Sequence, residues 1–248
     1  MKLVISGGGA RISYLIGIKK YFDENKIKFD QYAGSSSGSI FIVLMACNIS
    51  NDLIISEYSK LVSDNEYFKN YKLDIVKKYL NKLLPDNCYI ICSNKVRISY
   101  SYLDYLCNLI PFVRNKIETK FNSKNHLIET ILASCSFPFF INKNLFYKYQ
   151  NKYVLDGFFS NNTPLIEHNN SKNQIIIKTY YRALYDLDLF IYKKLSLKMI
   201  KSGYNHMKNF INKGETTINF SISNNKYNTK LYTYLFLFMF IYFLIKKI

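Results

Sequence analysis

The distribution of glycine constrains this sequence more than any other feature. The 248 residues include only nine glycines, and six of them fall at three places: residues 7–9, residues 34 and 38, and residue 157. Glycine is needed where the backbone takes a positive φ or where a backbone N–H must come close to a ligand. We therefore expect the chemistry of the chain at these three places.

The first glycine cluster lies between an expected strand and an expected helix. Residues 3–5 are apolar, and apolar side chains recur at helical spacing from Ile12 to about Asn25. Consecutive glycines at the start of a helix offer N–H donors to an anion or an oxyanion. Two nucleotide-binding motifs fail on spacing, because Ile12 stands where GxGxxG needs a small residue and a P-loop Lys-Ser/Thr pair is absent. The alternative is a tight turn without a ligand.

The second place has the pattern of a nucleophile elbow. Gly34 and Gly38 flank Ser36 in a GxSxG arrangement, and the apolar run of residues 40–46 follows. In such an elbow the serine sits on a sharp turn between a strand and a helix, where larger flanking side chains would clash. Serine-rich turns imitate this pattern, and residues 35, 36, 37 and 39 are all serine.

The third place is an Asp-Gly dipeptide at the end of an apolar stretch. Residues 153–155 lead directly into Asp156 and Gly157. Because Asp-Gly is common in ordinary turns, this dipeptide alone carries little information.

Taken together and in this order, the three places resemble the patatin-like phospholipase family. That family has a GGGxR loop, a GxSxG serine and an Asp-Gly dipeptide, which residues 7–11, 34–38 and 156–157 match. Residues 84–87, 95–99, 121–124 and 133–138 are similar to the branch that contains adiponutrin and adipose triglyceride lipase. The resemblance covers roughly residues 1–180. It implies an α/β fold, a three-layer sandwich whose mostly parallel central sheet is flanked by helices.

The resemblance also implies a lipid acyl hydrolase of the phospholipase A or lipase type, which needs no cofactor. Its catalytic dyad would be Ser36 as nucleophile and Asp156 as general base. Arg11 would face a lipid phosphate or support the glycine loop. The other implied site residues are the oxyanion-hole glycines Gly7, Gly8 and Gly9, and the turn glycines Gly34, Gly38 and Gly157.

The sequence departs from the family pattern at two positions. Phe158 follows Asp-Gly where the family usually has Gly or Ala, and Ser37 stands where Ala is common. The Phe158 ring would either crowd the site or line an acyl pocket. These departures keep open a second hypothesis, a lipid-binding or regulatory protein with little or no turnover.

A third hypothesis is an esterase with a Ser-His-Asp triad of the α/β-hydrolase type. The chain order Ser36, Asp156, then His168 or His206 would satisfy it. No histidine lies in a recognisable motif, and His126 looks like part of a helix start. We therefore expect all three histidines at the solvated surface and favour the dyad.

Charge and cysteine content bear on partners and metals. The chain has 34 Lys+Arg against 17 Asp+Glu, a net charge of +17, which favours anionic surfaces such as nucleic acid or acidic lipid. An AT-rich coding sequence is the plainer explanation. Without a nucleic-acid-binding module we expect no nucleic acid partner, and phospholipid or neutral lipid as substrate. The five cysteines form no CxxC and lie far from the histidines in sequence, so we expect no metal site and a reducing compartment.

The C-terminal segment differs in composition from the rest of the chain. Residues 231–245 are uncharged, contain seven aromatic residues and are bounded by lysines. As a helix they would rise about 22 Å, short of a hydrocarbon core of about 30 Å. We predict a catalytic domain at 1–228 and a tail at 229–248 that anchors the protein, as a transmembrane or interfacial segment, to an intracellular membrane or lipid droplet. A buried last helix or strand is the alternative.

The remaining hydrophobic patterns predict the secondary structure. Helices are expected within residues 50–84, 127–133 and 184–212, and strands at 88–92, 96–100 and 174–179. A hairpin of residues 145–149 and 153–155 would end at Asp156.

Overall fold

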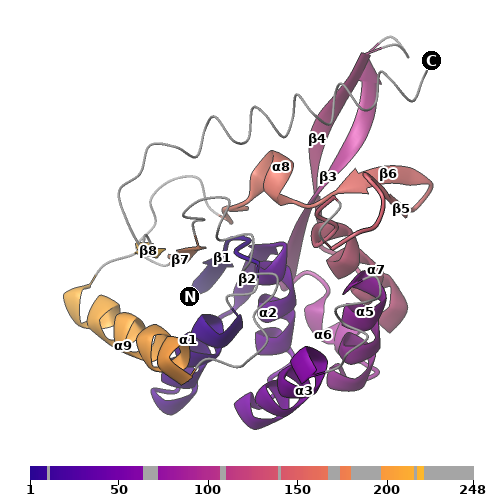
Figure 1. The fold of residues 1–248 in the computed structure, drawn as a ribbon. Helices are drawn as coiled ribbons and strands as arrows, with labels where there is room; N and C mark the ends of the chain where they lie inside the picture. Colours follow the sequence, from indigo (N-terminus) through magenta and orange to yellow (C-terminus); the bar gives the residue numbers. More distant parts are fainter. Residues whose placement is uncertain are drawn as a thin grey trace.

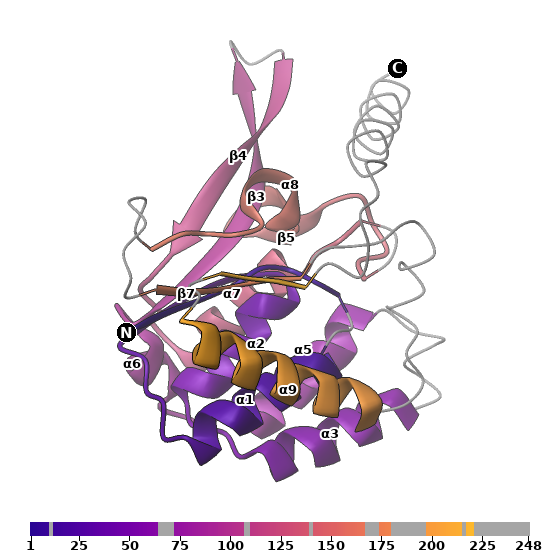
Figure 2. The same cartoon turned by 90° about the vertical axis from the view of Figure 1, so that its left-hand side faces the viewer.

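The computed structural model describes residues 1–9, 12–63, 72–106, 110–138, 141–166, 174–179, 197–214 and 217–220. Figure 1 shows a twisted sheet with most of the described helices below it and α8 (Phe158–Asn161) above it. Figure 2 shows the same arrangement from the side. The α/β fold with helices flanking a largely parallel sheet, expected from the sequence, is confirmed.

The sheet has eight strands in the order β5-β6-β3-β2-β1-β7-β8, with β4 paired to β3. The parallel part is formed by β1 (Lys2–Ile5), β2 (Gln31–Ser35), β3 (Val96–Leu106), β7 (Gln174–Thr179) and β8 (Thr217–Phe220). The antiparallel part adds β4 (Ile110–Glu118), β5 (Tyr147–Tyr149) and β6 (Lys152–Leu155). Strand β1 at the centre is buried on both faces, which explains its continuous apolar run.

Strand β3 pairs with three other strands, and these pairings determine where the site forms. Strand β4 occupies one edge of β3 from Ile98 to Leu106. Strands β2 and β6 therefore share the other edge, and they run in opposite directions. The last residue of β2 pairs with Ser99, and the last residue of β6 pairs with Ser101. The C-terminal ends of β2 and β6 consequently meet on β3, two residues apart.

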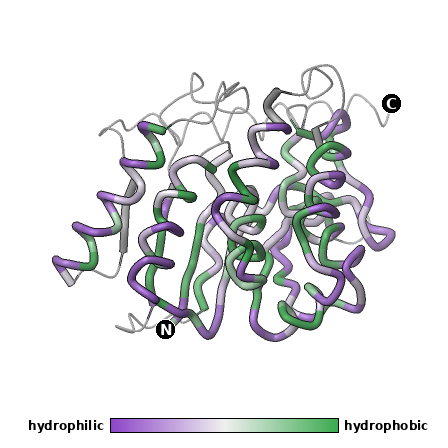
Figure 3. The backbone as a smooth tube through the Cα atoms, turned by 90° about the horizontal axis from the view of Figure 1, so that it is seen from below, coloured by the Kyte–Doolittle hydropathy of each residue, from purple (hydrophilic) through white to green (hydrophobic). Residues whose placement is uncertain are grey.

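The described helices of the large layer are α1 (Ile12–Glu24), α2 (Ser37–Ala46), α3 (Asn51–Ser63), α5 (Lys72–Leu83), α6 (Cys88–Cys92), α7 (Lys124–Ser134) and α9 (Leu197–Lys213). Hydrophilic and hydrophobic residues alternate along the outer helices in Figure 3, as expected for helices with one buried face. Helices α1 and α9 lie side by side (Figures 1 and 2) and touch through backbone. A Cβ on Gly17 would lie 2.0 Å from the Ile200 carbonyl oxygen, so glycine is required at this crossing.

Most predicted elements are confirmed, and one is wrong. The hairpin that ends at Asp156, the strand at 174–179 and the helix around residues 127–133 are present. Residues 88–92, predicted as a strand, form the short helix α6. Cys88 and Cys92 are buried one turn apart, whereas Ile90 between them is 63% exposed. A five-residue apolar run is compatible with either structure, and here burial follows the helical period.

The tail at 229–248 lies outside the described residues, as do residues 184–196 of the helix predicted at 184–212. Within the described part of the chain, the model contains no helix with the length and apolar character needed to cross a bilayer. A transmembrane helix therefore does not fit the described part, and the boundary between domain and tail stays a prediction.

Candidate active site

Ser36 occupies the sharp turn between β2 and α2. Its backbone has φ 52° and ψ −132°, an uncommon conformation for a residue other than glycine. Two hydrogen bonds hold the turn: the Ser36 N–H donates to Ser134 Oγ at 2.8 Å, and Ser39 Oγ donates to the Ser36 carbonyl at 2.6 Å. Ser134 Oγ in turn donates to the Ser99 carbonyl on β3 at 2.6 Å. The strained turn is thus attached to the sheet through a serine from α7.

The flanking glycines allow the turn to lie directly against β1. A Cβ on Gly38 would stand 2.3 Å from the Ile5 carbonyl oxygen. A Cβ on Gly34 would stand 2.8 Å from the Gly38 carbonyl group. Such distances leave no room for a side chain, which is the steric reason for the GxSxG spacing.

Asp156 follows β6 and lies against the serine turn. Ser36 Oγ donates a hydrogen bond to Asp156 Oδ2 at 2.8 Å, and the Phe158 N–H donates to Oδ1 at 2.9 Å. The backbone around Asp156 is also fixed, because Ser101 Oγ donates to its carbonyl at 2.7 Å. A Cβ on Gly157 would lie 2.3 Å from the Ser99 carbonyl oxygen, so the Asp-Gly turn packs as closely against β3 as the serine turn packs against β1.

Burial changes the acidity of this carboxyl group. Asp156 is 1% exposed, and removal from water raises its pKa to about 7, against the opposing effects of the Phe158 N–H and the Ser36 hydroxyl. A carboxylate whose pKa lies near neutrality is a stronger base than an ordinary aspartate. The side chain that accepts the Ser36 hydrogen bond can therefore accept its proton near neutral pH.

The glycine loop lies beside Ser36 but is held by other side chains. The Gly7 N–H donates to Asn162 Oδ1 at 2.9 Å, and the Gly8 N–H donates to Ser37 Oγ at 3.1 Å. Gly9 has φ 60° and borders the same cavity as Ser36. Among the residues that the structure describes, no acceptor for the Gly9 N–H is found. Ser37, which stands where the family commonly has Ala, supports the loop because its hydroxyl accepts the hydrogen bond from the Gly8 N–H.

A cavity of about 120 Å³ adjoins Ser36 and extends between α2, α3 and α5. Its walls are mostly apolar and include Ile40, Leu44, Ile54, Val76, Leu80 and Leu83. Glu57 is the charged residue among the described lining side chains, and it forms an ion pair with Lys60 at 2.5 Å. The cavity thus joins Ser36 to walls that are mostly apolar but include one carboxylate.

The Phe158 ring, expected either to crowd the site or to line an acyl pocket, packs against neighbouring aromatic rings. It does not belong to the described lining of the cavity. Its ring packs against Phe159 at 5.6 Å and Phe137 at 6.0 Å between centroids, while its N–H holds Asp156. The backbone of Phe158 therefore contributes to the site, and its ring lies outside the cavity.

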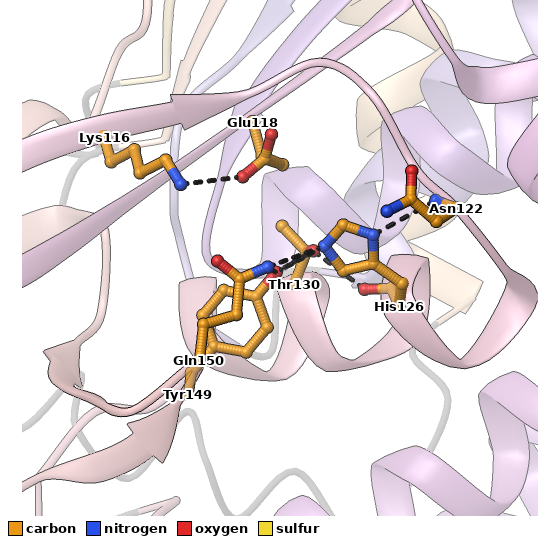
Figure 4. A network of polar contacts seen from close by, with 7 residues as sticks. All are labelled: Lys116, Glu118, Asn122, His126, Thr130, Tyr149 and Gln150. Carbon is orange, nitrogen blue, oxygen red and sulfur yellow. Dashed lines mark hydrogen bonds and ion pairs between the residues drawn. The ribbon is translucent and has the colours of Figure 1, made fainter.

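The expectation that every histidine lies at the solvated surface is wrong for His126. This residue is half-buried in the first turn of α7, where its Nδ1 accepts a hydrogen bond from the Asn122 N–H at 3.1 Å. Its Nε2 lies 2.9 Å from the Tyr149 hydroxyl and 2.9 Å from Gln150 Nε2, and Thr130 Oγ1 lies 2.7 Å from the same hydroxyl (Figure 4). Both ring nitrogens have partners, and the contacts of Nε2 connect α7 to the β5–β6 hairpin.

The other histidines and Arg11 complete the predicted residues. His206 is exposed on α9, with Nδ1 3.3 Å from the Tyr14 hydroxyl. His168 and Arg11 lie outside the described residues. In the part of the chain that is described, no histidine contacts Ser36 or Asp156, and no cluster of His, Cys, Asp and Glu has the arrangement of a metal site.

The fold and the site define an α/β protein with a nucleophile elbow, and the serine of this elbow is hydrogen-bonded to a buried aspartate. The model of the patatin-like phospholipase family matches residues 3–167, more than half of the chain, and the chain belongs to this family.

Individual proteins are less similar. The mouse 1-acylglycerol-3-phosphate O-acyltransferase Pnpla3 is 23% identical over 158 residues, which are 60% of this chain and 35% of that protein. A putative E3 ubiquitin-protein ligase of Plasmodium falciparum is 23% identical over 151 residues, 61% of this chain and 1% of that protein. The chain thus spans about a third or less of these relatives. VipD from Legionella pneumophila has a TM-score of 0.38 and 12% identity, with 75% of this chain and 51% of that chain covered.

Two residues of the site were missed from the sequence. Ser134 accepts the Ser36 N–H, and Asn162 accepts the Gly7 N–H. Ser134 lies within residues 133–138, which resemble the family, and Asn162 follows Gly157 by five positions. Neither residue type distinguishes a loop support from an ordinary polar residue without the fold.

Proposed function

We propose that this protein hydrolyses carboxylic esters of lipids, with Ser36 as nucleophile and Asp156 as the base that activates it. The observation that carries the proposal is the 2.8 Å hydrogen bond from Ser36 Oγ to the buried Asp156 Oδ2 at the mouth of an apolar cavity. A serine needs a base within hydrogen-bond reach, and this carboxylate meets that requirement without a histidine.

The reaction would proceed through an acyl-enzyme. Ser36 Oγ attacks the ester carbonyl as its proton passes to Asp156 Oδ2. The protonated carboxyl then gives the proton to the leaving alcohol as the ester C–O bond breaks. Water enters, loses a proton to the same carboxylate and releases the fatty acid, which restores both side chains.

The negative charge on the carbonyl oxygen would be held by backbone N–H groups of the glycine loop. The Gly9 N–H is the donor best suited to this role, because Gly9 borders the cavity next to Ser36. The Gly8 N–H would join it if it exchanged its present acceptor, Ser37 Oγ, for the oxyanion. Each such donor is typically worth a few kcal/mol of transition-state stabilisation.

The proposed substrates are phospholipids or neutral glycerolipids, whose acyl chain would enter the cavity between α2, α3 and α5. The apolar walls suit a hydrocarbon chain and offer little to a polar substrate. Such substrates are found in membranes and lipid droplets, and the net charge of +17 would favour anionic lipid surfaces.

The deciding experiment combines active-site labelling with product analysis. Wild-type protein should react with a fluorophosphonate at Ser36 and release fatty acid from phosphatidylcholine, triolein or both, as detected by mass spectrometry. Ser36→Ala should lose labelling and release, and Asp156→Asn should lose at least about a thousandfold in turnover. His206→Ala is the control and should stay within a few-fold of wild type.

Two results would overturn the proposal. Unlabelled Ser36 in folded protein, with no ester cleaved, would favour an inactive lipid-binding protein. A large loss in His206→Ala or His168→Ala would favour a Ser-His-Asp triad instead.

Attachment to a membrane or droplet through residues 229–248 is a separate proposal. It is supported by the uncharged aromatic run bounded by lysines. Deletion of residues 230–248 should move the protein from the membrane or droplet fraction to the supernatant on cell fractionation. A truncated protein that stays membrane-bound would disprove the anchor.

A further inference from the structure

Two cysteines meet at the end of α2 that is remote from the active site. Cys47 directly follows α2, and Cys92 is the last residue of α6. Their sulfur atoms lie 3.8 Å apart, close to van der Waals contact. Cys47 is half-buried and Cys92 is fully buried, so Cys47 is the more accessible of the two residues.

The surroundings favour ionisation of Cys47 over the other described thiols. The Cys92 thiol, as hydrogen-bond donor, and then Lys95 lower the pKa of Cys47 against the effect of burial. Burial raises the pKa of Cys88 to about 11, and it also raises the pKa of the fully buried Cys135. Because the thiolate is the reactive form of cysteine, Cys47 is the thiol best placed to react.

The positions also suit a covalent bond. A disulfide needs a sulfur–sulfur distance of about 2.05 Å, so the two atoms must approach by nearly 2 Å. Both residues lie at helix ends, where side-chain rotation and a small backbone shift are possible without breaking the interior of a helix.

We propose that Cys47 and Cys92 form an oxidation site for hydroperoxides, at which Cys47 reacts first and Cys92 resolves the product to a disulfide. The Cys47 thiolate attacks one oxygen of H2O2, the O–O bond breaks, and a sulfenic acid and hydroxide are formed. Cys92 sulfur then attacks Cys47 sulfur, the S–O bond breaks, and the Cys92 proton leaves with that oxygen as water. In total, two thiols and one peroxide give one disulfide and two waters.

The disulfide would constrain the segment between the two cysteines, which forms most of the cavity wall. Helices α3 and α5, which provide Ile54, Val76, Leu80 and Leu83 to the cavity, lie between Cys47 and Cys92 in the chain. A bond between these cysteines would close that segment into a covalent loop. The oxidised protein would therefore resist unfolding better than the reduced protein, by about 5–10 °C in Tm.

The test uses the full chain and H2O2, followed by alkylation of free thiols and peptide mapping by mass spectrometry. Wild-type protein should show a peptide pair that joins Cys47 to Cys92, lighter by two hydrogen atoms, which dithiothreitol reverses. Cys47→Ser should lose the cross-link and the rise in Tm. Cys88→Ser is the matched control, because Cys88 lies one turn from Cys92 on the same helix, and it should keep both.

Several outcomes would overturn the proposal. These are an oxidised Cys47 that stays sulfenic or sulfinic acid without a cross-link, a cross-link through Cys88, Cys107 or Cys135, and an unchanged Tm after complete cross-linking. If Cys92→Ser does not fold, Cys47→Ser at the half-buried position still decides the result. Because cross-linking and Tm need no substrate, this test is independent of the proposed hydrolase activity, and Ser36→Ala protein should behave like wild type.

Discussion

Ser36 Oγ lies 2.8 Å from Asp156 Oδ2 although 120 positions separate the two residues in the chain. Neither residue reaches the other by a flexible loop. Ser36 follows the last residue of β2, Asp156 follows the last residue of β6, and both strands end on the same edge of β3. The pair is therefore fixed by the sheet, which is the rigid kind of support that a catalytic pair needs.

The raised pKa of Asp156 predicts how turnover depends on pH. The carboxylate must be ionised to accept the Ser36 proton, and its pKa lies at about 7. We expect kcat/KM on a soluble ester such as p-nitrophenyl butyrate to fall about tenfold per pH unit below about pH 6, and to level off above about pH 8. A rate that is flat down to about pH 5 would show a base of ordinary acidity.

The same shift predicts an effect on stability. The pKa of Asp156 is about 7 in the folded protein and near 3.8 when unfolded, so between these values the folded protein holds a proton that the unfolded chain releases. The free energy of unfolding therefore falls as pH rises through this window. Asp156→Asn cannot ionise and should be more stable than wild type at pH 8.5, by about 2–4 kcal/mol.

The internal control for Asp156→Asn is the pH itself. At about pH 4 the wild-type carboxyl is protonated in the folded protein, so the advantage of the variant should largely vanish. Urea unfolding at the two pH values measures both differences. An equal difference at pH 4 and pH 8.5 would contradict the prediction.

Ser134 is predicted to support the strained serine turn. Ser134→Ala leaves the buried Ser36 N–H without its acceptor, at a cost of about 1–3 kcal/mol, and frees a turn that its own backbone angles disfavour. We expect kcat to fall about ten- to a hundredfold, with less effect on KM.

Ser136→Ala is the matched control for this variant. It removes a hydroxyl equally buried and two positions away, which donates to the Ala133 carbonyl at 2.7 Å and does not touch Ser36. Similar losses of kcat in the two variants would indicate a general effect of serine removal and not a specific support.

The cavity predicts a dependence on acyl-chain length. Ile40 lies on α2 one turn after Ser36 and lines the cavity, so Ile40→Trp should fill its near end. Turnover of a long-chain phosphatidylcholine should fall at least about tenfold, while a butyrate ester should stay within about threefold. The exposed Ile90→Trp on α6 is the control. Equal losses on both substrates would place the acyl chain elsewhere.

Much of the site can be predicted from short stretches of sequence, because each of its turns is formed by residues that are close together in the chain. The glycines at 34, 38 and 157 stand where a Cβ would strike backbone, and this requirement leaves a mark in the sequence. The spacing of apolar residues likewise predicts the central strands and the β5–β6 hairpin.

Other features depend on contacts between distant segments and leave no such mark. The hydrogen bond from the Ser36 N–H to Ser134 needs α7 to pack beside α2, and the cavity is lined by residues of α2, α3 and α5 together. Residues 88–92 form the helix α6 and not the predicted strand, because five apolar residues have no clear period and only burial shows which face is inside. The sequence does not predict the partial burial of His126, because its partner Tyr149 is 23 positions away in the chain.

Because β2 and β6 both end on β3, the residues of β3 determine how far apart the two strand ends lie. Ser99 and Ser101 set the spacing between the two strand ends, and neighbouring residues along a strand are about 3.3 Å apart. A slip of β6 by a single position would carry the carboxylate out of reach and turn it to the opposite face of the sheet. The segment from α3 to α5 takes no part in these strand pairings although it lines the cavity, so insertions there would alter the cavity while the distance between serine and aspartate stays the same.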